Sequence, residues 1–204
     1  MDLFEIRNWF AHNLVDYLRE KEEESLRKLN VLIEIVDGKS PEVVEYLREE
    51  LLSEFPLLKL ENGFLTLNEE LLDPFTKEYL EEKSEKYKDF LKTLGDFEPV
   101  HDDIEKNIHM ARKLFKSGLY FEVHELLEEL WFNEFGKYRE FIQALIQIAV
   151  AYYHLQNFNV KGYELLIQNA IELLKGYEGV LFSVDVDKLK KDLANATQDE
   201  LVEF

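Results

Sequence analysis

Apolar residues recur at helical spacing through the first third of the chain, which predicts three successive helices. The first covers residues 2–20, and its apolar positions are Leu3, Ile6, Phe10, Leu14 and Leu18. The second covers residues 25–36 and ends near Gly38. Ser40 followed by Pro41 is typical of a helix N-cap and first turn, so we expect the third helix to run from there to about Phe55.

A short β-hairpin is predicted at residues 57–67. Asn62 and Gly63 lie between two short alternating runs, and both tolerate the positive φ angles of a type I′ turn. Residues 68–94 then return to a helical pattern that is interrupted near Pro74. Two helices followed by a hairpin have the outline of a winged helix, but the acidic character of this half favours a packing or protein-docking role over DNA reading.

Helical segments with short connections fill the second half of the chain. Residues 95–101 read as a linker, and Asp102 or Asp103 is placed to cap the helix that follows. Helices are expected at residues 103–115, 120–131, 137–157, 160–175 and 185–193. We therefore expect a mainly α protein, with an acidic helical region at residues 1–95 that carries the hairpin. Residues 102–204 are expected to form an antiparallel bundle of four to five helices.

The composition of the chain indicates which kinds of partner and which cellular compartment to expect. The 204 residues include 43 Asp or Glu against 24 Lys or Arg, and the net charge of -19 argues against a nucleic acid partner. The absence of cysteine excludes disulfides and thiolate metal sites. The first residues lack the basic and then apolar pattern of a secretory signal, so we expect a cytoplasmic protein.

Residues 141–160 carry no charge and are long enough to span a membrane. Polar side chains interrupt the run, namely Gln143, Gln147, His154, Gln156, Asn157 and Asn159. We therefore predict a helix buried within the protein and no membrane association.

Two polar stripes carry the candidate chemistry. On the helix from Tyr120, His124 and Glu128 are four residues apart and therefore adjacent. The same stripe includes Phe121, Glu125 and Trp131 and borders the apolar side of the helix, whereas Glu122 and Glu129 are expected to be solvated.

On the helix from Lys137, the residues Gln143, Gln147, His154 and Asn157 form a second stripe. It contains only uncharged polar groups in a chain rich in Lys and Glu, which indicates a partly dry environment. If the two stripes face each other, they can bind a divalent metal, act as an acid–base pair, or form a structural hydrogen-bond network. The sequence leaves these three uses open, and it leaves the oligomeric state open too.

Residues 115–131 read F-K-S-G-L-Y-F-E-V-H-E-L-L-E-E-L-W, and residues 141–155 read F-I-Q-A-L-I-Q-I-A-V-A-Y-Y-H-L. Both runs resemble the two main conserved helices of the family called domain of unknown function 309, and weaker similarity extends the match to about residues 103–193. Departures from the family pattern fall outside the polar stripes, at Lys116, Val123, Ala144 and Phe158. Residues 1–95 carry no resemblance.

The resemblance implies an all-helical bundle and, from one label used in that family, a predicted metal-dependent hydrolase. It carries over the residues Glu122, His124, Glu125, Glu128, Gln143, Gln147 and His154. In the hydrolase hypothesis, His124, Glu128 and His154 hold a divalent metal and Glu125 acts as the general base. Glu122, Gln143, Gln147 and Trp131 are then the candidates for contacting a small-molecule ligand.

The alternative hypothesis is a non-enzymatic module for protein interaction. The turns at Gly118 and Asn159 give two helical hairpins that are similar to tetratricopeptide hairpins, although two units fall short of a self-standing array. In this interpretation the carboxylates are scaffolding and the acidic surface docks a basic protein.

Overall fold

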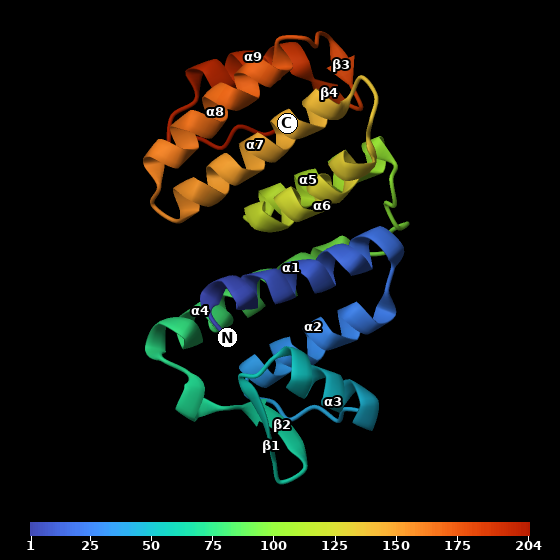
Figure 1. Ribbon diagram of the computed structural model, residues 1–204, viewed down its shortest axis with the longest axis vertical. Coiled ribbons are helices and arrows are strands. Elements are labelled where there is room, and N and C mark those ends of the chain that lie inside the picture. The colour runs from blue at the N-terminus through green and yellow to red at the C-terminus, as the bar shows by residue number, and fades with distance from the viewer. The chain divides into compact units, whose positions relative to one another are not determined.

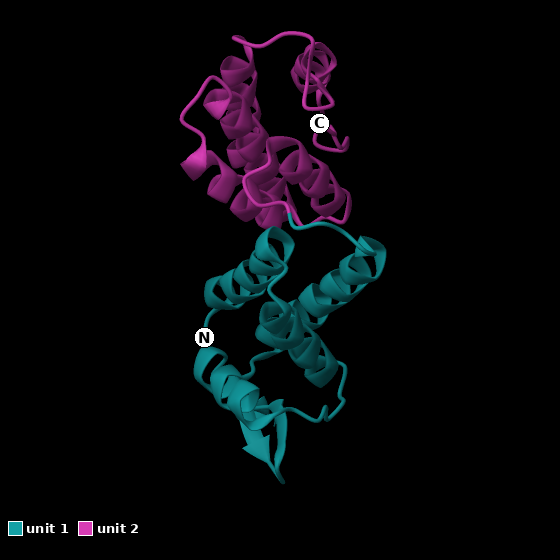
Figure 2. Cartoon of the chain, turned by 90° about the vertical axis from the view of Figure 1, so that its right-hand side faces the viewer, with its two compact units in different colours: residues 1–99 teal, residues 100–204 magenta.

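The computed structural model describes residues 1–204, and the chain divides into two compact units. Unit 1 comprises residues 1–99 and unit 2 comprises residues 100–204 (Figure 2). The fold is mainly α, with two small pairs of antiparallel strands, which confirms the predicted fold class.

Unit 1 is a small helical unit with one hairpin (Figure 1). Its elements are α1 Leu3–Glu20, α2 Glu23–Val36, α3 Glu45–Glu54, β1 Leu58–Glu61, β2 Phe64–Leu67, the 3-10 turn η1 Glu69–Leu71, and α4 Pro74–Leu94. Helix α1 begins with a capping box, in which Asp2 accepts from the backbone N–H of Glu5 while the Glu5 carboxylate accepts from that of Asp2. The core combines aliphatic side chains with aromatic rings, among which Phe10 and Tyr87 meet edge to face at 4.9 Å.

The hairpin has the predicted position and turn. Glu61 pairs with Phe64, and between them Asn62 and Gly63 have φ angles of 50° and 87°. Positive φ at both central positions is what a type I′ turn requires, and only Gly and Asn adopt it at low cost. The hairpin prediction is confirmed.

The predicted start of the third helix is wrong. Helix α3 begins at Glu45 and not at Ser40 or Pro41, because Val44 has an extended backbone with φ -63° and ψ 150°. Val43 and Val44 are β-branched, which favours extended backbone over a first helical turn. The cap signal of Ser40 and Pro41 is therefore outweighed by the two residues that follow it.

Unit 2 stacks consecutive helices against one another. Its elements are α5 Ile104–Lys116, α6 Tyr120–Asn133, α7 Arg139–Gln156, α8 Val160–Leu174, β3 Val180–Leu181, β4 Val184–Asp185 and α9 Val186–Asn195. Helix α6 packs between α5 and α7, and α8 packs on α7 (Figure 1). Of the two candidate caps, Asp103 accepts the hydrogen bond from the Lys106 N–H at 2.9 Å. The β3–β4 pair was not predicted, since its turn uses Phe182 and Ser183 at positive φ in place of the usual Asn or Gly.

Helix α7, which contains most of the uncharged run, is buried along most of its length, as predicted. None of the helices combines the length and the hydropathy that a membrane crossing needs.

Asp73 caps α4 and gives a test of how the fold responds to pH. Its carboxylate accepts from the Thr76 hydroxyl at 2.6 Å and from the backbone N–H groups of Phe75 and Thr76. These bonds, the one from the Thr76 hydroxyl foremost, hold the pKa of Asp73 below its usual range.

We predict that Asp73→Asn keeps the cap but removes its pH dependence. The folded-state pKa is lowered, so the stabilisation is present above the unfolded pKa of about 3.9 and is lost as the pH falls through the folded-state pKa. Urea unfolding at pH 6 and pH 3 should show the wild type losing more stability than the variant. Glu81→Gln, on the exposed side of the same helix, is the control, and an equal loss in wild type and Asp73→Asn would contradict the prediction.

Candidate functional site

The first polar stripe lies on α6, which is positioned by its apolar side. Gly118 has a φ of 69° and ends α5, so α6 can start at Tyr120 and reverse direction. The apolar residues of the buried side of α6 are Val123, Leu126, Leu127 and Leu130. Beside it, the side chains of His124 and Glu125 are 23% and 18% exposed, so the stripe is reachable from solvent and still largely desolvated.

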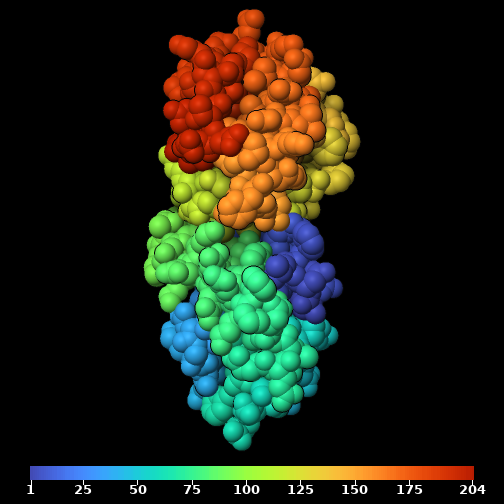
Figure 3. Space-filling view, turned by 90° about the vertical axis from the view of Figure 1, so that its left-hand side faces the viewer, coloured from blue at the N-terminus to red at the C-terminus, as the bar shows by residue number.

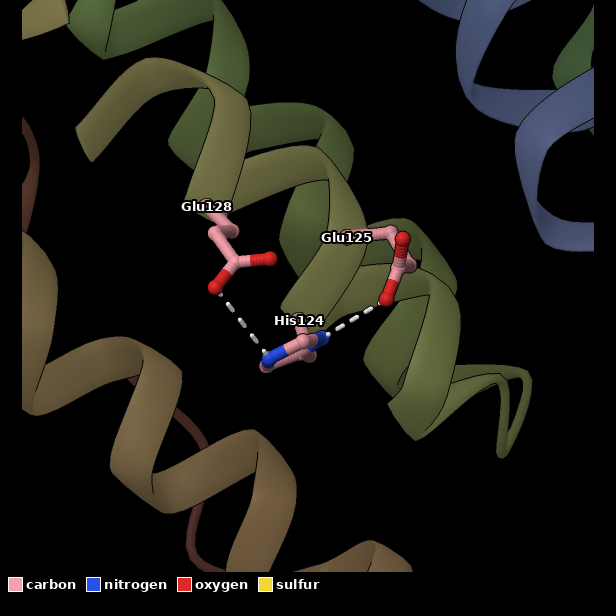
Figure 4. A group of neighbouring side chains, drawn as sticks. All are labelled: His124, Glu125 and Glu128. Atoms are coloured by element: carbon pink, nitrogen blue, oxygen red, sulfur yellow. Dashed lines mark hydrogen bonds and ion pairs between the residues drawn. The ribbon is translucent and has the colours of Figure 1, made fainter. Parts of the chain in front are cut away.

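His124 lies between two carboxylates (Figure 4). Its Nδ1 is 3.0 Å from Oε1 of Glu125, and its Nε2 is 3.9 Å from Oε1 of Glu128. An ionised carboxylate only accepts hydrogen bonds, so we assign the proton of the neutral imidazole to Nδ1, which donates to Glu125. The lone pair of His124 is then on Nε2, on the side of Glu128.

The donor set of this group fits a divalent cation. One ligand atom from each of His124, Glu125 and Glu128 can be chosen so that all three lie within 4.8 Å of one another. Imidazole nitrogen and carboxylate oxygen suit ions such as Zn²⁺, whose distance to either atom is about 2.1 Å. Because Nε2 of His124 and Oε1 of Glu128 are 3.9 Å apart, one ion can reach both atoms.

Glu125 has a different place from the one expected of a general base. With the ring proton assigned to Nδ1, Oε1 of Glu125 accepts from it at 3.0 Å and restrains the orientation of the ring. Phe121 adds a second restraint, since its ring stacks on His124 at a centroid distance of 5.7 Å. Phe121 also contacts the Tyr153 ring of α7 at 5.6 Å, which ties the stripe of α6 to the neighbouring helix.

His154 is not brought into this group. Its Nδ1 is 2.8 Å from Nδ2 of Asn159, whose Oδ1 accepts from the Gly162 N–H at 3.0 Å. The bond from Gly162 fixes which end of the Asn159 amide is the donor, so Nδ1 of His154 must accept and its proton sits on Nε2. In this arrangement neither ring nitrogen offers a lone pair to a metal.

The ring of His154 belongs to the connection between α7 and α8. A Cβ at position 162 would lie 2.8 Å from the imidazole, so the site requires Gly162. Asn159 meanwhile caps α8, and His154 donates no ligand to the group on α6.

The other acidic and amide residues of the two stripes differ in how deeply they are buried. Glu122 was expected to be solvated but is only 1% exposed, because the buried side of α6 extends further round the helix than its Leu and Val positions suggest. Glu122 lies in the first turn of α6. Gln143 and Gln147 are half-buried on α7, and Glu129 is exposed as expected.

Trp131 is in contact with Arg139, a residue that the sequence analysis did not identify as a candidate. The Arg139 guanidinium lies 3.5 Å from the centroid of the Trp131 ring and donates to the Trp131 carbonyl at 2.6 Å. Arg139 is on the next helix, so no periodicity within α6 could have indicated the pair. The contact ties Trp131 to the first residue of α7, and the prediction that Trp131 contacts a ligand stays a prediction.

Residues 108–166 match the family described as "Domain of unknown function (DUF309)". This confirms the resemblance over a shorter range than 103–193, and the range includes all of the candidate residues. Among curated proteins, "Uncharacterized protein YpuF" of Bacillus subtilis (strain 168) is 36% identical over 69 residues, which cover 33% of this chain and 40% of that relative. No solved structure matches the chain significantly.

The two imidazoles should hold opposite tautomers in the metal-free protein. We predict that long-range ¹H–¹⁵N NMR spectra at pH 9 place the His124 proton on Nδ1 and the His154 proton on Nε2. Glu125→Ala should remove the preference at His124 alone, and Asn159→Ala should remove it at His154 alone. The same tautomer at both residues of the wild type would refute the assignment.

Proposed function

We propose that unit 2 binds a divalent cation through His124 and Glu128 and that the site hydrolyses a small molecule. The observation that carries the proposal is the hydrogen bond from His124 to Glu125, which leaves the lone pair of the ring on the side of Glu128. A carboxylate that orients a histidine in this way is the usual second shell of a metal site.

We assign different roles to Glu125 and Glu128 because the two carboxylates differ in position and exposure. Glu125 holds the imidazole and favours the Nε2 lone pair, so we assign it an orienting role in place of general base. Glu128 is the more exposed carboxylate, with its side chain 41% exposed, and is the better placed of the two to bind a cation that enters from solvent. A cation bound here supplies Lewis acidity and lowers the pKa of water.

The half-buried amides of Gln143 and Gln147 lie on α7, which packs directly on α6. Their side chains offer both donors and acceptors, and we assign them to orienting a polar small-molecule substrate. Glu122 and His154 are left out of this assignment, because one is buried and the other binds Asn159.

A second candidate, the interaction module, is favoured by exposed aromatic rings. Phe132, Phe135 and Phe158 are 56%, 87% and 95% exposed, and all three lie at or near the ends of α6 and α7. In this case a partner protein would be retained equally by wild type and His124→Ala in a pull-down, while Phe135→Ser would lose it.

Titration calorimetry with Zn²⁺ or Mn²⁺ tests the metal site. We expect about one ion per chain, no binding by His124→Ala, and affinity lower by about 10–100-fold in Glu125→Gln, because a neutral amide is a weaker acceptor for the Nδ1 proton and orients the ring less firmly. At an ion concentration of 100 times Kd, the wild type should gain about 2.7 kcal/mol of stability.

Glu129→Gln is the matched control, because it removes one exposed carboxylate from the same helix. It should bind the ion as the wild type does. Absence of binding by the wild type, or an equal loss in Glu129→Gln, would overturn the metal site, and binding without turnover of any ester or phosphoester would overturn the hydrolase alone.

A further inference from the structure

The segment of residues 196–204, which follows α9, lies on unit 2 in the manner of a bound peptide. It contains no helix or strand and returns across the bundle, as the red chain in Figure 1 shows. Val202 and Phe204 are 7% and 8% exposed, whereas Leu201 between the turn and Val202 is 43% exposed. Burial of alternate side chains is the pattern of an extended chain with one side in a groove.

Side chains from three helices bind the backbone of this segment. The Tyr152 hydroxyl of α7 donates to the carbonyl of Glu200 at 2.9 Å and accepts from the N–H of Val202 at 2.8 Å. The Tyr163 hydroxyl of α8 donates to the carbonyl of Thr197 at 3.3 Å. These bonds satisfy backbone groups without specifying side chains, as in peptide-binding grooves.

Side chains of helix α5 also contact the segment. Arg112 donates through Nε to the carbonyl of Phe204 at 2.5 Å, and its other nitrogens donate to Oγ and the carbonyl oxygen of Ser183. Ser183 therefore holds the guanidinium in place whether or not residue 204 is bound. Lys116, one turn further along α5, pairs with Glu203 at 3.1 Å.

The Phe204 ring packs against a cluster of aromatic rings. That ring meets Phe115 at 5.3 Å, and Phe115 in turn contacts Tyr120 and Tyr152 at 4.9 Å and 5.2 Å. Burial raises the pKa of Tyr152 and lowers the pKa of Arg112, so both polar groups lie in desolvated surroundings where hydrogen bonds are strong. In Figure 3 the red end of the chain lies against the orange and yellow-green helices.

We propose that this groove is a peptide-binding site and that residues 200–204 are its resident, exchangeable ligand. The site recognises an extended segment with an aliphatic residue, an acidic residue and an aromatic residue in succession. Val202 and Phe204 fill the apolar positions, Lys116 selects the acidic residue, and Tyr152 and Arg112 hold the backbone. The connection at residues 197–200 is exposed and irregular, which allows the segment to leave without disturbing α9.

A released variant tests the proposal directly. Val202→Asp combined with Phe204→Asp should expel the segment, and a fluorescent peptide of residues 196–204 should then bind with at least tenfold higher affinity than to the wild type, whose groove is occupied. Leu201→Asp alters an exposed side chain of the same segment and should behave as the wild type. Adding Arg112→Gln to the released variant should weaken peptide binding about tenfold, because the Phe204 carbonyl loses a charged donor.

A released variant that keeps its helical circular dichroism but does not bind the peptide would overturn the proposal. If that variant loses its helical signal, a protease site placed between residues 196 and 199 of the otherwise unchanged chain replaces it. After cleavage the helical signal should persist, and the fragment should exchange with the fluorescent peptide. Unfolding on cleavage, or a fragment that never exchanges, would show that the segment is a fixed part of the fold.

Discussion

The hydrogen bond between Nδ1 of His124 and Glu125 is the interaction on which the functional account depends. Consecutive residues on a helix do not normally face each other, yet these two side chains meet at 3.0 Å beside the buried side of α6. With the ring proton assigned to Nδ1, this bond leaves the lone pair on Nε2, on the side of Glu128. Without it, His124 and Glu128 are an ordinary helical pair four residues apart.

That bond is in turn held by the packing of α6. The helix lies between α5 and α7, and Phe121 stacks on His124 while it touches Tyr153 of α7. Because all three members of the group lie on one helix, their spacing is independent of how accurately two helices meet. If the group binds an ion as proposed, it offers few protein ligands, and water or substrate would occupy the remaining positions around the ion.

Helix α7 carries two unrelated sets of contacts on different sides. His154 binds Asn159 in the connection to α8, and Tyr152 binds the backbone of residues 200–202. Residues two apart on a helix point about 200° away from each other, so the two sets do not compete. The contacts of His154 and the contacts of residues 200–202 are thus separate features of α7.

The sequence predicted most helices and the hairpin, because periodicity and the Asn62–Gly63 turn report local preferences directly. It predicted the pairing of His124 with Glu128 for the same reason, since a spacing of four residues is local. The sequence did not predict the surroundings of a side chain where they depend on residues from another element. His154 is hydrogen-bonded to Asn159, and Trp131 lies under the Arg139 guanidinium. Glu122 is buried because the buried side of α6 is wider than its apolar positions indicate.

The most direct test of the central claim is a crystal structure of the protein soaked in Mn²⁺, with anomalous scattering recorded. We expect an anomalous peak bonded to Nε2 of His124 and to the Glu128 carboxylate, with Glu125 still hydrogen-bonded to Nδ1. A map without a peak there, or with an ion bound through Nδ1 of His124 or through His154, would contradict it.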